Sequence, residues 1–143
     1  MTTNQKGAIA ETAIALAAIK LGIDVYRPVV EGGRYDLIFG VGSELIRVQC
    51  KWGARYGDVI IVPCISSRRG RAGYVRRAYT SEQIDAIVAY AFDLDQCYFL
   101  PIELVQNRPA VRLRIAPTRN NQRRHINWAE DFELEARLAP TGP

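Results

Sequence analysis

The chain is poor in the two side chains that most often bind transition metals, histidine and cysteine. It has one histidine, His125, and three cysteines, Cys50, Cys64 and Cys97, among 143 residues. A lone histidine cannot form a histidine-rich metal site, and no spacing around it supports a catalytic triad. The cysteines form no CxxC pair and lie in apolar segments, which predicts buried, reduced thiols instead of a zinc site or disulfides.

Long hydrophobic runs are also missing. Although 48% of the residues are hydrophobic, the most apolar segment, AIAETAIALAAIKLG, is interrupted by Glu11 and Lys20. No run approaches the ~20 apolar residues that span a membrane. The N-terminus lacks a charged segment followed by an apolar run, so no signal peptide is expected. We therefore expect a globular protein of the cytoplasm with no membrane partner.

Acidic residues are absent from two tracts that are rich in arginine. Residues 59–81 hold five arginines and residues 104–129 hold six, with no acid in either tract, and the net charge is +4. Clustered positive charge favours a polyanionic partner such as nucleic acid, although either tract alone would also suit a solvated surface. The side chains expected to contact DNA are Ser67, Arg68, Arg69, Arg71, Arg119, Asn121, Arg123 and Arg124.

Hydrophobic periodicity and turn residues predict one α/β domain over residues 1–143, with residues 138–143 as a frayed tail. Helices are expected at residues 4–21 and 80–92, and a short helix or turn at 127–138. Strands are expected at residues 25–30, 35–39, 45–52, 58–63, 97–104 and 111–115, with a glycine- and arginine-rich loop at 66–77. The order α-β-β-β-β-α-β-β predicts a central sheet flanked by helices.

Three polar residues interrupt the hairpin predicted between residues 35 and 52. Successive strand residues point to opposite faces, so Gln49 and Lys51 share a face, and the other face holds Ile46, Val48, Cys50 and Trp52. Asp36 stands in the first strand, which is otherwise apolar, and an acid is unfavourable there unless a metal ion or a lysine compensates. Glu11 lies beside small and apolar residues of the first helix, and we expect it to reach the end of the hairpin that carries Asp36.

Two carboxylates, an amide oxygen and an amine in one cluster suit a hard divalent cation. We expect Glu11, Asp36 and Gln49 to ligate Mg²⁺, with Mn²⁺ as a substitute, because all three offer oxygen donors. Such a metal can acidify a water that attacks a phosphate, and Lys51 can stabilise charge or orient the water. The chain has sixteen arginines but only three lysines, so lysine is not its usual cation. A lysine at position 51 therefore indicates that a compact ammonium is required there. These four are the expected catalytic residues.

The segments GAIAETAIALAAIKLGIDVYRP, YDLIF, VQCKWGAR and NNQRRHINWAEDF resemble the PD-(D/E)XK nuclease superfamily, and look most like its small homing endonucleases encoded in group I introns. The resemblance implies a restriction-endonuclease-like core with a central mixed sheet, the helix glutamate at Glu11, the aspartate at Asp36 and the (Glu/Asp)-X-Lys motif at residues 49–51. It further implies a metal-dependent endonuclease that makes a site-specific double-strand break in DNA. Gln49 departs from the motif, because an amide carries no charge where an acid is usual.

Three interpretations stay open on the sequence. For a homing endonuclease, one chain offers one site, so cutting both strands of double-stranded DNA requires a homodimer or homotetramer. A Holliday junction resolvase of the same fold would cut four-way junctions with little sequence preference. A catalytically inactive nucleic-acid-binding module is the third interpretation, which Gln49 in place of an acid keeps open.

Overall fold

The computed structural model of the chain describes residues 1–71, 73–116 and 125–138. It begins with helix α1 (Thr3–Lys20), whose first turn is capped by a pair of reciprocal hydrogen bonds. The Gln5 N–H donates to Thr2 Oγ1 at 3.1 Å, and the Thr2 N–H donates to Gln5 Oε1 at 2.8 Å. Gly22, with a φ of 81°, follows the end of the helix. No helix in the described parts of the chain is both long and apolar enough to cross a membrane.

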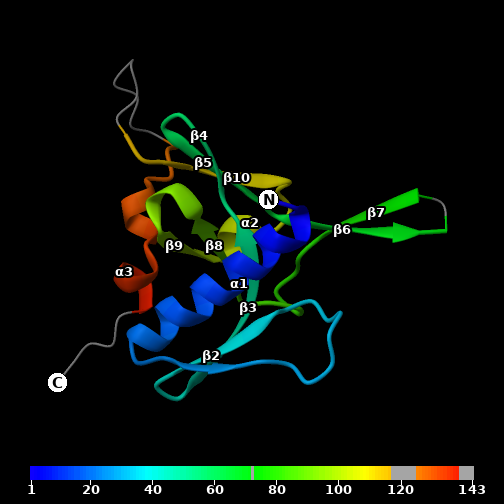
Figure 1. Ribbon diagram of the computed structural model, residues 1–143, viewed down its shortest axis with the longest axis horizontal. Helices are drawn as coiled ribbons and strands as arrows, with labels where there is room; N and C mark the ends of the chain where they lie inside the picture. The colour runs from blue at the N-terminus through cyan, green and yellow to red at the C-terminus, as the bar shows by residue number, and fades with distance from the viewer. Residues whose placement is uncertain (72, 117–124, 139–143) are drawn as a thin grey trace.

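Five strands form the central mixed sheet (Figure 1). In spatial order they are β1 (Asp24–Tyr26), β2 (Leu37–Val41), β3 (Glu44–Trp52), β8 (Ala86–Ala91) and β9 (Gln96–Pro101). β2 and β3 are joined by a tight turn in which Gly42 adopts the positive φ of 60° that such a hairpin requires. β3 pairs in parallel with β8, with Val48 opposite Ala86, whereas the other neighbouring strands are antiparallel.

A three-stranded sheet and a separate hairpin contain the other strands of the described residues. The three-stranded sheet has the order β10 (Ala110–Arg114), β5 (Val59–Pro63) and β4 (Ala54–Tyr56). The hairpin consists of β6 (Ile65–Gly70) and β7 (Gly73–Ala78), and it projects away from the rest of the molecule in Figure 1. The short helices are η1 (Phe92–Leu94), α2 (Ile102–Val105), η2 (Ala129–Phe132) and α3 (Leu134–Leu138).

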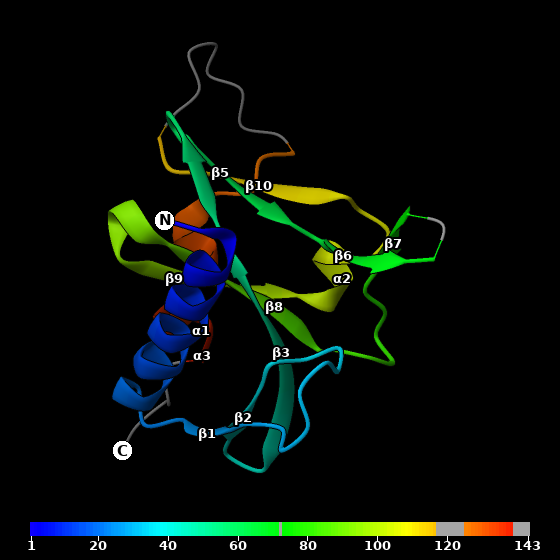
Figure 2. The ribbon, with the colours of Figure 1, turned by 45° about the vertical axis from the view of Figure 1, so that its right-hand side comes forward.

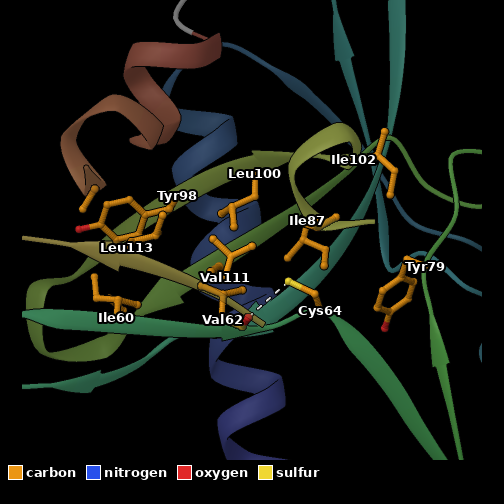
Figure 3. Close-up of a cluster of buried hydrophobic side chains, with 14 of the residues drawn as sticks. Ile60, Val62, Cys64, Tyr79, Ile87, Tyr98, Leu100, Ile102, Val111 and Leu113 are labelled. Atoms are coloured by element: carbon orange, nitrogen blue, oxygen red, sulfur yellow. Dashed lines mark hydrogen bonds between the residues drawn. The ribbon is translucent and has the colours of Figure 1, made fainter. Parts of the chain in front are cut away.

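The central sheet has a hydrophobic core on each of its faces. On one face, Ile14 of α1 and Leu134 of α3 belong to the same buried cluster as Phe39 and Val48. On the other face, β5 and β10, which lie side by side in Figure 2, pack against β8 and β9. Figure 3 shows the side chains of these four strands gathered around Ile87. β8 lies between the two cores, so all six of its residues are buried.

The predicted α/β class with a central mixed sheet is confirmed, but the helix predicted at residues 80–92 is wrong. Residues 80–85 hold a turn in which the Ile84 N–H donates to the Thr80 carbonyl at 3.1 Å, and residues 86–91 form β8. The Thr80 N–H donates to the Gln83 side chain at 3.3 Å, as in a capping box, yet no helix follows. A short apolar run that is covered on both faces suits a central strand. The predicted order of elements is therefore wrong at this position.

The loop predicted at residues 66–77 is also wrong, because these residues form most of the β6–β7 hairpin. The two strands pair from Ile65 and Ala78 to Gly70 and Gly73. The glycines that suggested a loop form the tight end of the hairpin, where Gly73 adopts a φ of 109°. The arginines of the tract are thus carried by a two-stranded ribbon.

Several other predicted boundaries differ by a few residues. The strand predicted at 25–30 stops at Tyr26, before Pro28, which cannot donate to a ladder. β4 was not predicted, and residues 102–104, predicted as the end of a strand, begin α2. Leu138, assigned to the tail, is the last residue of α3, and residues 139–143 lie outside the described residues.

Candidate active site

Asp36 lies immediately before β2 and is fixed to β3 by two hydrogen bonds. Its N–H donates to the Val48 carbonyl at 2.8 Å, and its Oδ2 accepts from the Cys50 N–H at 2.9 Å. The ladder between β2 and β3 ends at Leu37 and Val48, so no backbone carbonyl of β2 is paired with the Cys50 N–H. The Asp36 carboxylate accepts from this N–H in place of a backbone carbonyl. The prediction placed Asp36 within a strand, whereas it stands at the entrance of one.

Glu11 and Asp36 line the same cavity, which has a volume of about 380 Å³ and is otherwise lined mainly by the loop at residues 27–33. Glu11 follows the buried Ala10 on α1 and is itself partly exposed. Its Oε1 lies 3.8 Å from the Nε of Arg27. An ion pair of this length with an exposed arginine contributes little to stability, so it leaves Glu11 available to a ligand.

Lys51 lies on β3, with its side chain partly buried on the face opposite to α1. Its Nζ donates to the Ile65 carbonyl at 3.3 Å and lies 5.2 Å from the centre of the Tyr79 ring. Strand alternation puts Gln49, also partly buried, on the same face of β3, as predicted. Asp36 and Lys51 attract each other electrostatically, whereas no hydrogen bond within the described residues joins Gln49 to either.

Burial dominates the ionisation of the site. The pKa of Asp36 is raised because burial disfavours the carboxylate more than the Cys50 N–H and the Lys51 charge favour it. The pKa of Lys51 is lowered because burial disfavours the ammonium more than the Asp36 carboxylate favours it. The pKa of the Cys50 thiol is raised by burial and then by the charges of Asp36 and Glu11, so both carboxylates act on the same residue of β3. A cation beside Asp36 would favour its carboxylate form, and a phosphate beside Lys51 would favour its ammonium form.

Two residues next to the site were not predicted, Arg34 and Tyr79. The Arg34 guanidinium donates to Ser66 Oγ at 2.6 Å and to the Ala78 carbonyl at 3.1 Å, and its Cζ lies 4.4 Å from the centre of the Tyr79 ring. Tyr79 is 2% exposed, and burial raises the pKa of its hydroxyl to about 12. The one sequence signal for Arg34 is its position two residues before Asp36, and Tyr79 adjoins the segment that was taken for a helix.

The carboxylates of Glu11 and Asp36 fit a divalent cation that takes its remaining ligands from other groups. Among the described residues, no three His, Cys, Asp or Glu side chains lie close enough together to hold a metal ion. Glu11 and Asp36 supply two carboxylates at one cavity, so a third donor must be the Gln49 amide, a water or a phosphate oxygen. Oxygen donors with two formal charges suit Mg²⁺ or Mn²⁺ better than a softer metal.

The predicted DNA-contacting residues fall into two groups. Ser67, Arg68, Arg69 and Arg71 belong to the β6–β7 hairpin, whereas Arg119, Asn121, Arg123 and Arg124 lie outside the described residues. Arg76 and Arg77 of β7 are exposed on the same hairpin. A cavity of about 680 Å³ is lined by Arg108, Arg112 and Arg114, and no acid is found among the described residues that line it. The exposed arginines of β7 and the arginines that line this cavity are thus two groups of basic side chains on the described part of the chain.

The chain is similar over most of its length to known proteins. The PD-(D/E)XK endonuclease family matches residues 1–135. Among solved structures, the bacterial homing endonuclease I-Ssp6803I matches with a TM-score of 0.74 and 27% sequence identity, covering 93% of this chain and 89% of that chain. No curated protein sequence matches the chain.

Proposed function

The chain belongs to the PD-(D/E)XK endonuclease family, as the resemblance in its sequence predicted, and from this membership we propose that it is a metal-dependent, site-specific DNA endonuclease of the homing type. It hydrolyses phosphodiester bonds of double-stranded DNA in the cytoplasm and breaks both strands at one target. The family match and the similarity to a homing endonuclease support a nuclease that acts on DNA.

The observation that carries the proposal is the position of Asp36 between a second carboxylate and an ammonium. Asp36 shares a cavity with Glu11 and attracts Lys51 on the adjoining strand. The two carboxylates at this cavity can hold a cation, and the Lys51 amine, which interacts electrostatically with Asp36, can bind a phosphate oxygen that approaches Asp36. A cation held by the carboxylates and an ammonium close to Asp36 would both stabilise the charge that develops on a phosphate during hydrolysis.

The residues would divide the chemistry among them. A divalent cation at this site would supply a Lewis acid for the phosphate and a bound water of lowered pKa. Glu11 and Asp36 would hold the cation with Gln49 as a neutral ligand, and the Cys50 N–H orients the Asp36 carboxylate in advance. Lys51 would donate to a phosphate oxygen or to the attacking water, and its lowered pKa makes proton transfer easier than for an exposed lysine.

The β6–β7 hairpin would bind the DNA next to the site. A two-stranded ribbon fits the major groove of B-DNA, and Arg68, Arg69 and Arg71 would contact phosphates or guanine edges from it. Ser67 would donate to a phosphate. The second basic group, Arg119, Asn121, Arg123 and Arg124, has the side chains that contact guanine and adenine edges.

One chain offers one such site, so a double-strand break requires at least two copies. We expect a homodimer or homotetramer whose symmetry matches a roughly palindromic target. Light scattering on the free protein and on its DNA complex tests this expectation. A particle that stays monomeric on DNA would exclude concerted cutting of both strands.

The function is tested by cleavage of a randomised duplex library by the wild type and Lys51→Ala, in Mg²⁺, Mn²⁺ and EDTA. Lys20→Ala, which removes an exposed lysine at the end of α1, is the matched control. We expect metal-dependent cutting at one enriched sequence, which Lys51→Ala loses and the control keeps.

Other outcomes distinguish the alternatives. A protein that cuts no duplex but cuts four-way junctions would be a Holliday junction resolvase. A protein that binds DNA equally well with and without metal, and cuts neither substrate at any Mn²⁺ concentration, would be an inactive binding module.

A further inference from the structure

The guanidinium of Arg34 joins the two strands of the β6–β7 hairpin at its base. It donates to Ser66 Oγ on β6 at 2.6 Å and to the Ala78 carbonyl on β7 at 3.1 Å. Ser66 Oγ in turn donates to the Arg77 carbonyl at 3.4 Å across the hairpin. Because Arg34 stands two residues before Asp36, these bonds tie the hairpin to the strand that enters the candidate active site.

The same guanidinium lies over the ring of Tyr79, and so does the ammonium of Lys51. The ring centre lies 4.4 Å from Arg34 Cζ and 5.2 Å from Lys51 Nζ. Tyr79 belongs to the core between the two sheets, at the end of the cluster beyond Cys64 in Figure 3. A ring that is packed in a core cannot shift freely, so it fixes the two cations relative to each other.

Lys51 is also bonded to the hairpin directly. Its Nζ donates to the carbonyl of Ile65, the first residue of β6, at 3.3 Å. Arg34 is partly buried, and its Nε is buried without a hydrogen-bond partner among the described residues, so the inner edge of this guanidinium is shielded from solvent. The two like charges over one ring repel each other. Ser66 and Ala78 hold Arg34, whereas the Ile65 carbonyl and the attraction of Asp36 hold Lys51. The position of Lys51 therefore depends on the position of the hairpin base.

We propose that Arg34 is a positioning residue that holds Lys51 in place and couples it to the β6–β7 hairpin. The inference rests on the proposed function, in which the hairpin contacts DNA and Lys51 stabilises charge at the phosphate. DNA that engages the hairpin then fixes Arg34 through Ser66 and Ala78, and with it the ammonium. Lysine cannot replace Arg34, because only a planar guanidinium donates to two acceptors while it stacks on a ring.

The position of Lys51 can be measured without activity, because the chain has only three lysines. Labelling with ¹³C at the lysine ε carbon gives one NMR signal for each, and Lys51→Arg identifies the signal of Lys51. The Tyr79 ring should displace this signal from that of the exposed Lys20. Lys6 provides an internal reference, since its Nζ lies 5.7 Å from the centre of a different ring, that of Trp52.

In Arg34→Gln we expect the Lys51 signal to move toward that of Lys20, while the Lys6 signal stays in place. An unchanged Lys51 signal in the folded variant would overturn the proposal. If Arg34→Gln does not fold, Ser66→Ala decides, because it keeps Arg34 and removes only a partly exposed hydroxyl, which accepts from Arg34 and donates to the Arg77 carbonyl. A smaller shift in the same direction is then expected, and no shift overturns the proposal.

Cleavage distinguishes a positioning role from a general structural one. With enzyme in excess, Arg34→Gln should cut DNA about 10–100-fold more slowly than the wild type, while the Kd for the same DNA in EDTA stays unchanged. The matched control is Arg137→Gln, since Arg137 lies 4.6 Å from the centre of the Phe132 ring and donates to a backbone carbonyl at 2.8 Å. It should cut at the wild-type rate.

The cleavage result is interpreted together with the NMR result. An Arg34→Gln rate equal to that of the wild type would overturn the proposal. If the wild type cuts no DNA, the proposed function fails, and the Lys51 signal alone still decides whether Arg34 positions Lys51.

Discussion

Asparagine and alanine at position 36 separate the hydrogen bond that Asp36 accepts from the charge that it carries. Asp36→Asn keeps a side-chain oxygen for the Cys50 N–H, which now donates at 2.9 Å, whereas Asp36→Ala leaves that donor without an acceptor. A buried donor without a partner costs about 1–3 kcal/mol. At about 2–4 °C per kcal/mol for a chain of about this length, the alanine variant should melt about 2–12 °C below the asparagine variant.

The charge has its own, opposite effect on stability. Burial raises the pKa of Asp36 above its ordinary value of 3.8, so the folded protein binds this proton more tightly than the unfolded chain does. The free energy of unfolding then falls as the pH rises from about 3.8 through the raised pKa. Asp36→Asn has no proton to lose, so at about pH 7 it should be more stable than the wild type, and at about pH 3 the two should converge.

Thermal unfolding in EDTA measures the difference between the two variants, urea unfolding in EDTA at several pH values measures the effect of the charge, and the cleavage assay measures a third effect. Neither variant should cut DNA, because each lacks a carboxylate to hold the cation, and both should still bind DNA. The reasoning is refuted if Asp36→Asn is less stable than the wild type near pH 7, or if the asparagine and alanine variants unfold alike. Retained cleavage in Asp36→Asn would exclude the carboxylate as a metal ligand.

Three further substitutions test other contacts. Gln49→Glu adds a third carboxylate, so the Mg²⁺ concentration for half-maximal cleavage should fall on the order of 10-fold, and an unchanged midpoint would exclude Gln49 as a ligand. Asp85 accepts hydrogen bonds from the Arg47 guanidinium at 3.0 and 3.1 Å, which lower its pKa. The stability that the ionised Asp85 contributes is present above the unfolded pKa of about 3.8 and is lost as the pH falls through the folded pKa. Asp85→Asn should therefore lower the Tm near pH 7 but not near pH 2. Equal decreases in Tm at both pH values would refute a stabilising ion pair between Asp85 and Arg47. Gly53→Ala places a Cβ 2.9 Å from Ile60 Cγ2, which should cost about 1–3 kcal/mol in urea unfolding, and a neutral effect would mean that Ile60 can move aside.

The parts of the candidate site that lie on one strand follow from the sequence. The two-residue period of β3 puts Gln49 and Lys51 on one face, because side chains of a strand alternate whatever the rest of the fold does. Asp36 was found for a similar reason, since an acid in an apolar segment needs compensation. The metal-binding roles of Glu11, Asp36 and Gln49 stay predictions that the cleavage experiments test.

Glu11 and Asp36 were expected to meet, and they line one cavity, but other parts that depend on distant segments were missed. The apolar run at residues 86–91 has no period that distinguishes a buried strand from a buried helix, and only the layers on both of its faces select the strand. The contacts of Arg34 with Ser66 and Ala78 join segments that are far apart along the chain. No local pattern marks an arginine as the partner of a hairpin that begins after four further strands, so these contacts require the tertiary structure.

The parallel pairing of β3 with β8 bears on how the chain folds during synthesis. β3 pairs with the preceding strand β2 in a hairpin at once, but its other edge stays open until β8 leaves the ribosome, after four intervening strands. Parallel pairing across such a separation is slow, and an open edge invites pairing with other chains. The four candidate site residues all precede β8, so the sheet that holds them is completed only after they have left the ribosome, and a chain that ends before β8 would expose this edge of β3 to other chains.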